Sequence, residues 1–176
     1  MTNYRRAFLA GGTYFFIVNL ADRRASLLTK HIGSLRAAFR YTRERHPFAI
    51  EAIVVLPDHL HAIWSLPEGD ADFPLRWRLI KAAFSRGLPR SEAISTSRSY
   101  KSERGIWQRR YWEHAIRDQS DFNRHVDYIH LNPVKHGHAA RAKEWPYSSY
   151  RRMVRLHGYP ADWSGDPEES VSFGER

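Results

Sequence analysis

The chain has 176 residues, the size of one domain that can bury a sizeable hydrophobic core. Its 28 lysines and arginines against 19 aspartates and glutamates give a formal net charge of +9 and a pI near 10.1. This excess favours a polyanionic partner such as nucleic acid, and the 14% of aromatic residues could stack on bases. The absence of cysteine excludes disulfides and cysteine-ligated zinc sites.

The N-terminal part of the chain shows no membrane signal. Its apolar run, residues 13–20, is too short to span a bilayer, and its flanks lack the layout of a signal peptide. Together with the lack of cysteine, which suits a reducing compartment, this predicts a cytoplasmic protein without a membrane partner.

The first predicted elements are a strand and a helix. Residues 13–20 are β-branched and aromatic, as in a buried strand. Ser26 is a candidate N-cap for an amphipathic helix that Pro47 closes. Apolar residues recur at helical spacing between them, at Leu28, Ile32, Leu35 and Phe39.

A hairpin and a second helix follow. The strand-like runs 48–55 and 59–66 are separated by Leu-Pro-Asp, which predicts a β-hairpin. A helix should begin at Pro74 and end near Gly87. Residues 88–105 contain five serines and no apolar period, which indicates a long, flexible loop.

The last elements are a strand and two helices. Residues 106–116 are predicted as the fourth strand, and residues 118–137 as a long helix. Pro133 should disturb or end that helix, and Gly137 should mark its exit. Residues 146–158 form a shorter final helix.

This order of elements predicts the fold. It is the split βαβ pattern of an α+β, ferredoxin-like (RRM-like) domain, an antiparallel sheet with helices on one face, plus an added C-terminal helix. Residues 159–176 are an acidic tail with five acids and one base. One hypothesis is that this tail occupies the cleft that would bind DNA and must be displaced from it. The alternative is a disordered, solvated tail.

Two histidines lie one residue apart on the third predicted strand. Because side chains alternate along a strand, His59 and His61 point to the same face and Leu60 to the other. Two imidazoles on one face form half of a divalent-metal site. In a chain with ten histidines one such pair is a weak signal, and His136-Gly-His138 is a second match.

The long C-terminal helix carries a candidate nucleophile. Tyr128 and Asn132 are four residues apart and therefore share a helical face. A tyrosine hydroxyl can form covalent intermediates, and an amide oxygen can bind a metal. The alternative is that Tyr128 is an ordinary half-buried aromatic residue. This alternative remains because the chain has nine tyrosines, and any one of them can simply pack in the core.

The chain also carries longer motifs in a fixed order: YRRAFLAGGTYFFIVNL, VVLPDHLHAIWSLPEGD, RWRLIKAAFS, IWQRRYWEHAIR, DYIHLNPVKHG and WPYSSY. In their order and spacing these closely resemble the REP-associated tyrosine transposases. These are stand-alone relatives of the single-tyrosine HUH transposases of insertion sequences. The resemblance covers nearly all of residues 4–165 and is weak in the serine-rich loop and in the tail.

The resemblance implies roles for four residues. His59 and His61 match the metal-binding HUH pair, and Tyr128 matches the catalytic tyrosine. Asn132 falls where related transposases carry a glutamine as the third metal ligand. The implied cofactor is Mg²⁺ or Mn²⁺, and imidazole ligands suit Mn²⁺ better.

The resemblance also implies the reaction and the domain. The family acts on repetitive extragenic palindromes, which are short DNA hairpins, and cuts and rejoins single strands. Attack by Tyr128 on phosphorus would give a 5′-phosphotyrosine and a free 3′-hydroxyl. The transposase domain would be residues 1–158, with the flexible loop at 88–105.

Basic and aromatic residues outside this set are candidates for DNA contact. The basic residues Arg78 and Lys81 share a face of the second long helix. In the fourth strand, two arginines alternate with aromatic residues, a pattern that suits phosphate contact and base stacking. Two more basic residues follow the helix that carries Tyr128. For each of these residues, the alternative is a solvated surface position without a role in DNA binding. They are Arg78, Lys81, Trp107, Arg109, Arg110, Trp112, Lys135 and His136.

Two other functions remain open at this point. One is a non-catalytic module that binds single-stranded or hairpin nucleic acid and whose histidine pair is vestigial. The other is a metal-dependent nuclease that uses water, in which Tyr128 is structural. We expect a monomer, with a dimer as the alternative.

Overall fold

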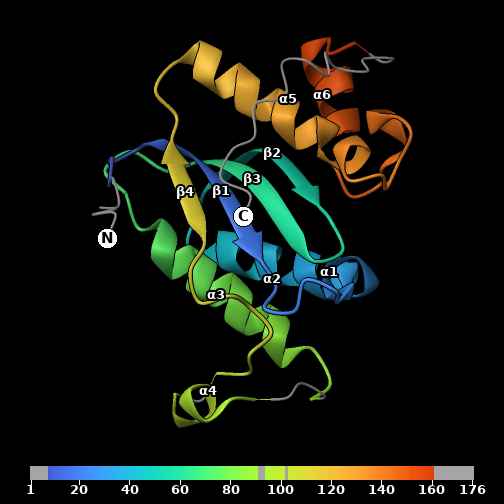
Figure 1. Cartoon of the computed structure of the whole chain (residues 1–176). Helices are drawn as coiled ribbons and strands as arrows, with labels where there is room; N and C mark the ends of the chain where they lie inside the picture. The colour runs from blue at the N-terminus through green and yellow to red at the C-terminus, as the bar shows by residue number, and fades with distance from the viewer. Residues whose placement is uncertain (1–7, 91–93, 102, 161–176) are drawn as a thin grey trace, which may run out of the picture.

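A four-stranded antiparallel sheet with the order β2-β3-β1-β4 organises the chain (Figure 1). The computed structural model describes residues 8–90, 94–101 and 103–160, so the acidic tail 161–176 and its hypothetical place in the DNA cleft lie outside it. The strands are β1 (Thr13–Asn19), β2 (Ala49–Val55), β3 (His59–Ser65) and β4 (Trp112–Ala115). The helices are α1 (Leu27–Lys30), α2 (Ile32–Arg45), α3 (Phe73–Arg86), α4 (Thr96–Tyr100), α5 (Gln119–Lys135), the 3-10 turn η1 (Ala142–Glu144) and α6 (Tyr150–His157).

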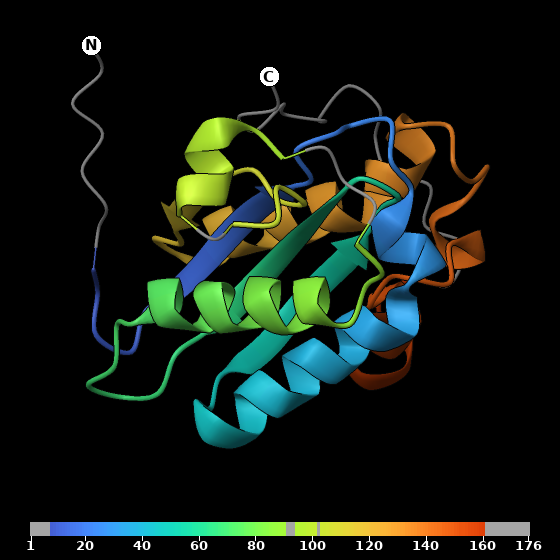
Figure 2. The ribbon, with the colours of Figure 1, turned by 90° about the horizontal axis from the view of Figure 1, so that it is seen from below.

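The sheet is covered on both faces. Alternate side chains of β1 enter two separate cores, because successive residues of a strand point in opposite directions. Tyr14, Phe16 and Val18 face α2 and α3, which lie side by side on one face (Figure 2). Phe15 and Ile17 face α5 on the other, together with the helix residues Val126 and Ile129.

The ferredoxin-like prediction is confirmed, and the hairpin predicted at Leu-Pro-Asp joins β2 to β3. α2 and α3, the helices of the two βαβ halves, share one face as expected. The added helix, α5, covers the opposite face, where a second set of apolar strand residues would otherwise be exposed. No helix in the described part of the chain is long and apolar enough to cross a membrane.

Several boundaries differ from the predicted ones. The helix predicted from Ser26 is interrupted at His31 and forms α1 and α2, Ser26 makes no side-chain capping bond, and the final helix begins at Tyr150 rather than at residue 146. β4 begins at Trp112, because the preceding residues run irregularly and Trp107 forms only an isolated bridge with Leu20. The serine-rich loop contains the short helix α4. Helix α5 continues through Pro133 and ends two residues later at Lys135, after which Gly137 adopts a φ of 69° that suits glycine.

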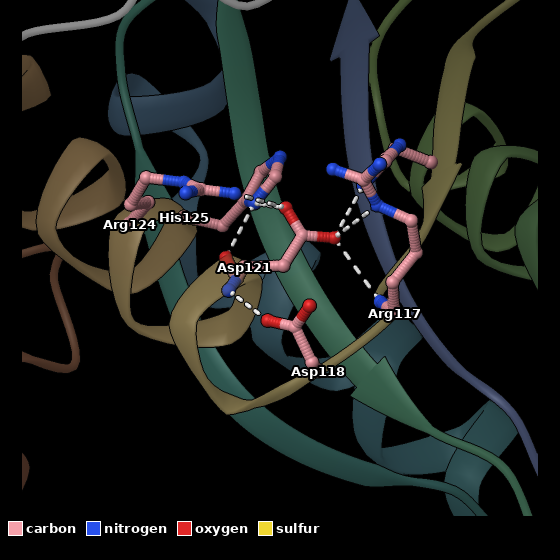
Figure 3. A network of polar contacts seen from close by, with 6 residues as sticks. Arg117, Asp118, Asp121, Arg124 and His125 are labelled. Carbon is pink, nitrogen blue, oxygen red and sulfur yellow. Dashed lines mark hydrogen bonds and ion pairs between the residues drawn. The ribbon is translucent and has the colours of Figure 1, made fainter.

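A buried carboxylate ties α5 to the sheet. Asp121, in the first turn of α5, is 1% exposed, and its Oδ2 lies 2.8 Å from Nε2 of His114 on β4. Arg117 and Arg124 approach the same carboxylate from opposite sides, with contacts of 3.3 and 3.4 Å (Figure 3). Asp118 caps the helix by accepting the backbone N–H of Asp121 at 2.8 Å. These contacts fix where α5 starts on the sheet.

The environment of Asp121 keeps it ionised. Burial by itself opposes ionisation, but hydrogen bonds from His114 and from the backbone and side chain of Arg117 outweigh it. The pKa of Asp121 is therefore held well below its usual range. The folded protein binds a proton at this site less readily than the unfolded chain does.

We predict that Asp121→Asn lowers the free energy of unfolding by about 2 kcal/mol at pH 7, because the buried ion pairs are lost. The folded pKa lies below the unfolded value of about 3.9, so this stabilisation is present above that pH and is lost as the pH falls below it. Urea unfolding of wild type and variant should thus differ less at pH 3 than at pH 7. Glu68→Gln, at an exposed position, is the control. An equal difference at both pH values would contradict the electrostatic origin.

Candidate active site

The two histidines of β3 lie side by side at one end of the sheet. His59 pairs with Asn19 of β1 and His61 with Ile17, and both imidazoles lie on the face that α5 covers. Their ring centroids are 5.0 Å apart, and the rings are nearly perpendicular. The side chains are 2% and 0% exposed. The predicted common face of His59 and His61 is therefore observed.

Helix α5 brings the predicted tyrosine to this pair. The ring of Tyr128 lies 5.3 Å from that of His61, in an edge-on arrangement. Asn132 follows one turn later on the same helical face and is fully buried. Asp121 and His125 precede them at helical spacing, so one buried polar stripe of α5 faces the sheet.

A carboxylate orients the first histidine. Asp58 Oδ1 lies 2.7 Å from His59 Nδ1, so Nδ1–H donates and the lone pair of Nε2 is directed away from Asp58. Arg23 forms an ion pair with the same carboxylate. Burial opposes ionisation of Asp58, but its hydrogen bond with His59 and the charge of Arg23 lower its pKa to about 2.

This environment of His59 fits a metal ligand. Nε2 of His59 is buried and has no hydrogen-bond partner within the described ranges 8–90, 94–101 and 103–160. A metal-binding histidine usually donates its other N–H to a carboxylate, as His59 does to Asp58. The sequence signal for this role is that Asp58 directly precedes His59, although the Leu-Pro-Asp run by itself predicts only a turn.

Two of the predicted DNA-contact residues lie directly at the site. Nζ of Lys135, the last residue of α5, is 5.1 Å from the centre of the Tyr128 ring. The ring of His136 is 5.1 Å from that of His59. Both residues are exposed. Two exposed basic residues therefore lie beside the buried histidine–tyrosine group.

Four other predicted DNA-contact residues line one cavity of about 620 Å³, between α3 and residues 103–111. Arg78 is exposed there, and Arg109 forms an ion pair of 2.8 Å with Glu103. Lys81 donates to the carbonyl oxygen of Gln108 at 3.0 Å. The four residues are Arg78, Lys81, Trp107 and Arg109.

The structure corrects the predicted role of Trp107. Its side chain is only 6% exposed, packs against Phe84, and donates its indole N–H to the carbonyl oxygen of Lys81. Trp107 is thus a core residue and not a surface for base stacking. Arg110 is exposed, and the half-buried Trp112 packs against Phe15 on the α5 face.

A second cluster of potential metal ligands lies on the α5 face. Ligand atoms of His114, Asp121 and His125 lie within 4.8 Å of one another. The carboxylate in this cluster is already neutralised by Arg117 and Arg124, which disfavours a cation there. The imidazoles of His59 and His61 are better suited to bind a cation than this cluster is.

Comparison with known proteins places the chain in a family. No protein-family model matches it. A REP-associated tyrosine transposase of Escherichia coli K12 is 47% identical over 176 residues, which is 100% of this chain and 98% of that protein. A Haemophilus influenzae relative assigned to the same family is 47% identical over 172 residues, 97% and 98% of the two chains.

A solved structure supports the same assignment. It is described as a REP-associated tyrosine transposase bound to a REP hairpin, and it superposes with a TM-score of 0.84 at 46% identity. The match covers 100% of this chain and 98% of the solved one. Since sequence and fold agree over the full length of both, the chain belongs to the REP-associated tyrosine transposases, enzymes that cut and rejoin DNA.

Proposed function

We propose that this chain cuts and rejoins single-stranded DNA beside REP hairpins through a covalent 5′-phosphotyrosine on Tyr128. The main support for this proposal is the position of Tyr128 on α5, whose ring centroid lies 5.3 Å from that of His61 on β3. The relative whose solved structure holds a REP hairpin supports a hairpin as the partner of this chain as well.

Three side chains would hold a divalent cation, Mg²⁺ or Mn²⁺. They are the imidazoles of His59 and His61 and the amide oxygen of Asn132, all buried at the same end of the sheet. When bound, such an ion polarises the scissile phosphate and stabilises charge in the transition state. Asp58 holds His59 in the tautomer whose Nε2 can serve as a ligand.

Tyr128 supplies the nucleophile. Its phenolic oxygen forms a bond to phosphorus, while the bond from phosphorus to the 3′ oxygen breaks. The phenol loses its proton, and the leaving oxygen gains one to become a 3′-hydroxyl. An unperturbed phenol is only about 0.1% ionised at pH 7, and the ammonium of Lys135, 5.1 Å from the centre of the Tyr128 ring, adds positive charge that would favour the phenolate.

Rejoining follows as the reverse attack. The phosphotyrosine conserves the energy of the broken phosphodiester, so a 3′-hydroxyl can attack it without a nucleotide cofactor. The DNA would be held by Lys135 and His136 at the site and by further residues near β4 and on α3. Arg78 and Arg110 are exposed and form no ion pair within the described residues, and Arg109, Trp112, Lys135 and His136 complete this proposed surface.

We predict that Tyr128→Phe abolishes cleavage of a hairpin that carries a single-stranded flank, a fall of at least about 10³-fold. The ring and its packing against His61 remain, so hairpin affinity should stay close to that of wild type. Cleavage on sequencing gels and binding by fluorescence anisotropy measure the two quantities. Tyr100→Phe, at a 91% exposed position, is the matched control. Cleavage by the Tyr128 variant at the wild-type rate would exclude this nucleophile.

A second prediction concerns the metal. His59→Ala and His61→Gln should each abolish Mn²⁺-dependent cleavage, whereas Asp58→Asn should raise the Mn²⁺ concentration for half-maximal cleavage by about 10- to 100-fold. His31→Ala, at the junction of α1 and α2, controls for the loss of a histidine. Circular dichroism verifies folding. Folded variants with an unchanged Mn²⁺ dependence would rule out a metal site here.

A further inference from the structure

A series of neighbouring aromatic rings starts at the two histidines of β3. Its first step joins His59 to His136, whose ring centroids lie 5.1 Å apart. The ring of His138 lies 6.3 Å from that of His136, and the ring of Trp145 lies 5.4 Å from that of His138. Tyr147 follows, 5.4 Å from Trp145 and nearly perpendicular to it. Because each ring adjoins the next, the series is continuous with the candidate active site.

The middle of this series is accessible from outside. His136 and His138 are exposed and Trp145 is half-buried, in contrast to Trp107, which is only 6% exposed. The planes of His136 and His138 differ by 25°, and those of His138 and Trp145 by 30°. Three rings with similar orientations therefore lie at the surface, as a flat ligand that stacks on them would require.

The end of α5 holds His138 in its position. Gly137 adopts a φ of 69°, which turns the chain back at the end of the helix. The backbone N–H of His138 donates to the carbonyl oxygen of Pro133 at 2.8 Å, and that of Gly137 to Val134 at 3.0 Å. This hydrogen-bonded closure of the helix end fixes the backbone of His138 next to His136.

Trp145 is also fixed in the absence of a ligand. Its indole N–H donates to the carbonyl oxygen of Val55 at 2.9 Å, and its ring packs against the core on the α5 face. A ring that is already ordered loses little conformational entropy when a ligand stacks on it.

The segment that carries the two exposed histidines is basic. Residues 135–143, KHGHAARAK, contain Lys135, Arg141 and Lys143 and no acid. Lys135 and Arg141 are exposed. Positive charge together with accessible rings is the combination by which proteins hold single-stranded nucleic acid, since the charges attract the backbone and the rings stack on the bases.

We propose that His138 and Trp145 stack on unpaired bases of the single strand next to the hairpin. The inference rests on the proposed function, which puts a single strand at His59, where the series of rings begins. Paired bases cannot use these rings, because they already stack on one another inside the duplex. The second His-x-His match of the sequence, His136-Gly-His138, then serves DNA binding and not metal binding.

The test compares three DNA probes on the full chain. All share one REP-type hairpin, which carries about six unpaired deoxyadenosines at each end, the same number of abasic nucleotides, or no flank. The abasic flank keeps the phosphates and lacks the bases. Affinity is measured by fluorescence anisotropy over a salt series without added Mn²⁺. Stacking is thus judged independently of cleavage, and the Tyr128 chemistry is judged on cleavage alone.

Wild type should bind the deoxyadenosine flank at least about fivefold more tightly than the abasic flank. His138→Gln should remove most of this difference and leave the salt dependence unchanged, because no phosphate contact is lost. His138→Phe, which keeps a ring, should behave as wild type. Trp145→Leu, with folding verified by circular dichroism, should resemble His138→Gln.

Tyr100→Gln is the matched control. It removes a 91% exposed ring from α4, which lies on the other side of the sheet from α5 (Figure 1), and it should leave all three affinities unchanged.

Three results would overturn the proposal. Equal affinity of wild type for the deoxyadenosine and abasic flanks would show that no base stacks on the protein. An equal loss on all three probes in His138→Gln would place His138 against the hairpin itself. A loss in His138→Phe as large as in His138→Gln would show that His138 acts through its nitrogens and not through its ring.

Discussion

The packing of α5 across the second face of the sheet is the constraint on which the site depends. Apolar contacts of Val126 and Ile129 with Phe15 and Ile17 hold the helix there, and the ion pairs of Asp121 fix its first turn against β4. With its start anchored and its middle buried, the helix must carry Tyr128 to the end of the sheet where the histidines lie. Because the site is shared between a strand and a helix, any shift of α5 changes the distance between Tyr128 and the two histidines.

Charged groups lie both inside and outside the end of the sheet that holds the histidines. The histidine–tyrosine group is buried, whereas Lys135 and His136 beside it are exposed. Inside, the carboxylate of Asp58 sets the tautomer of His59, and outside, the basic surface can draw in a polyanion. Two further cavities with basic lining residues lie elsewhere, one between α3 and residues 103–111 and one along β2 beside α2.

Much of this arrangement could be predicted from the sequence, because it follows from local periodicity. The alternation of a strand puts His59 and His61 on one face, and the pitch of a helix aligns Tyr128 with Asn132. The order of strands and helices predicted the ferredoxin-like sheet, and the motifs predicted the family, which the comparisons show.

The remainder depends on contacts between distant segments, which periodicity does not encode. An amphipathic pattern shows that α5 has a buried side, but not that it covers the second face of the sheet. Trp107 reads as a surface aromatic beside arginines, yet its indole is buried against α3. The cavity along β2 brings α2 next to residues about a hundred positions later in the chain. Pro133 was expected to disturb or end the long helix, yet α5 continues through it to Lys135.

The central claim is that Tyr128 becomes covalently bonded to the 5′ phosphate of the cut strand. Wild-type protein incubated with a labelled flanked hairpin and Mn²⁺ should yield an adduct that survives SDS. Digestion with protease and nuclease, followed by mass spectrometry, should find the mass of a 5′-phosphoryl nucleotide on the peptide that contains Tyr128, and on that residue. Cleavage without any adduct, or an adduct on another residue, would contradict the account.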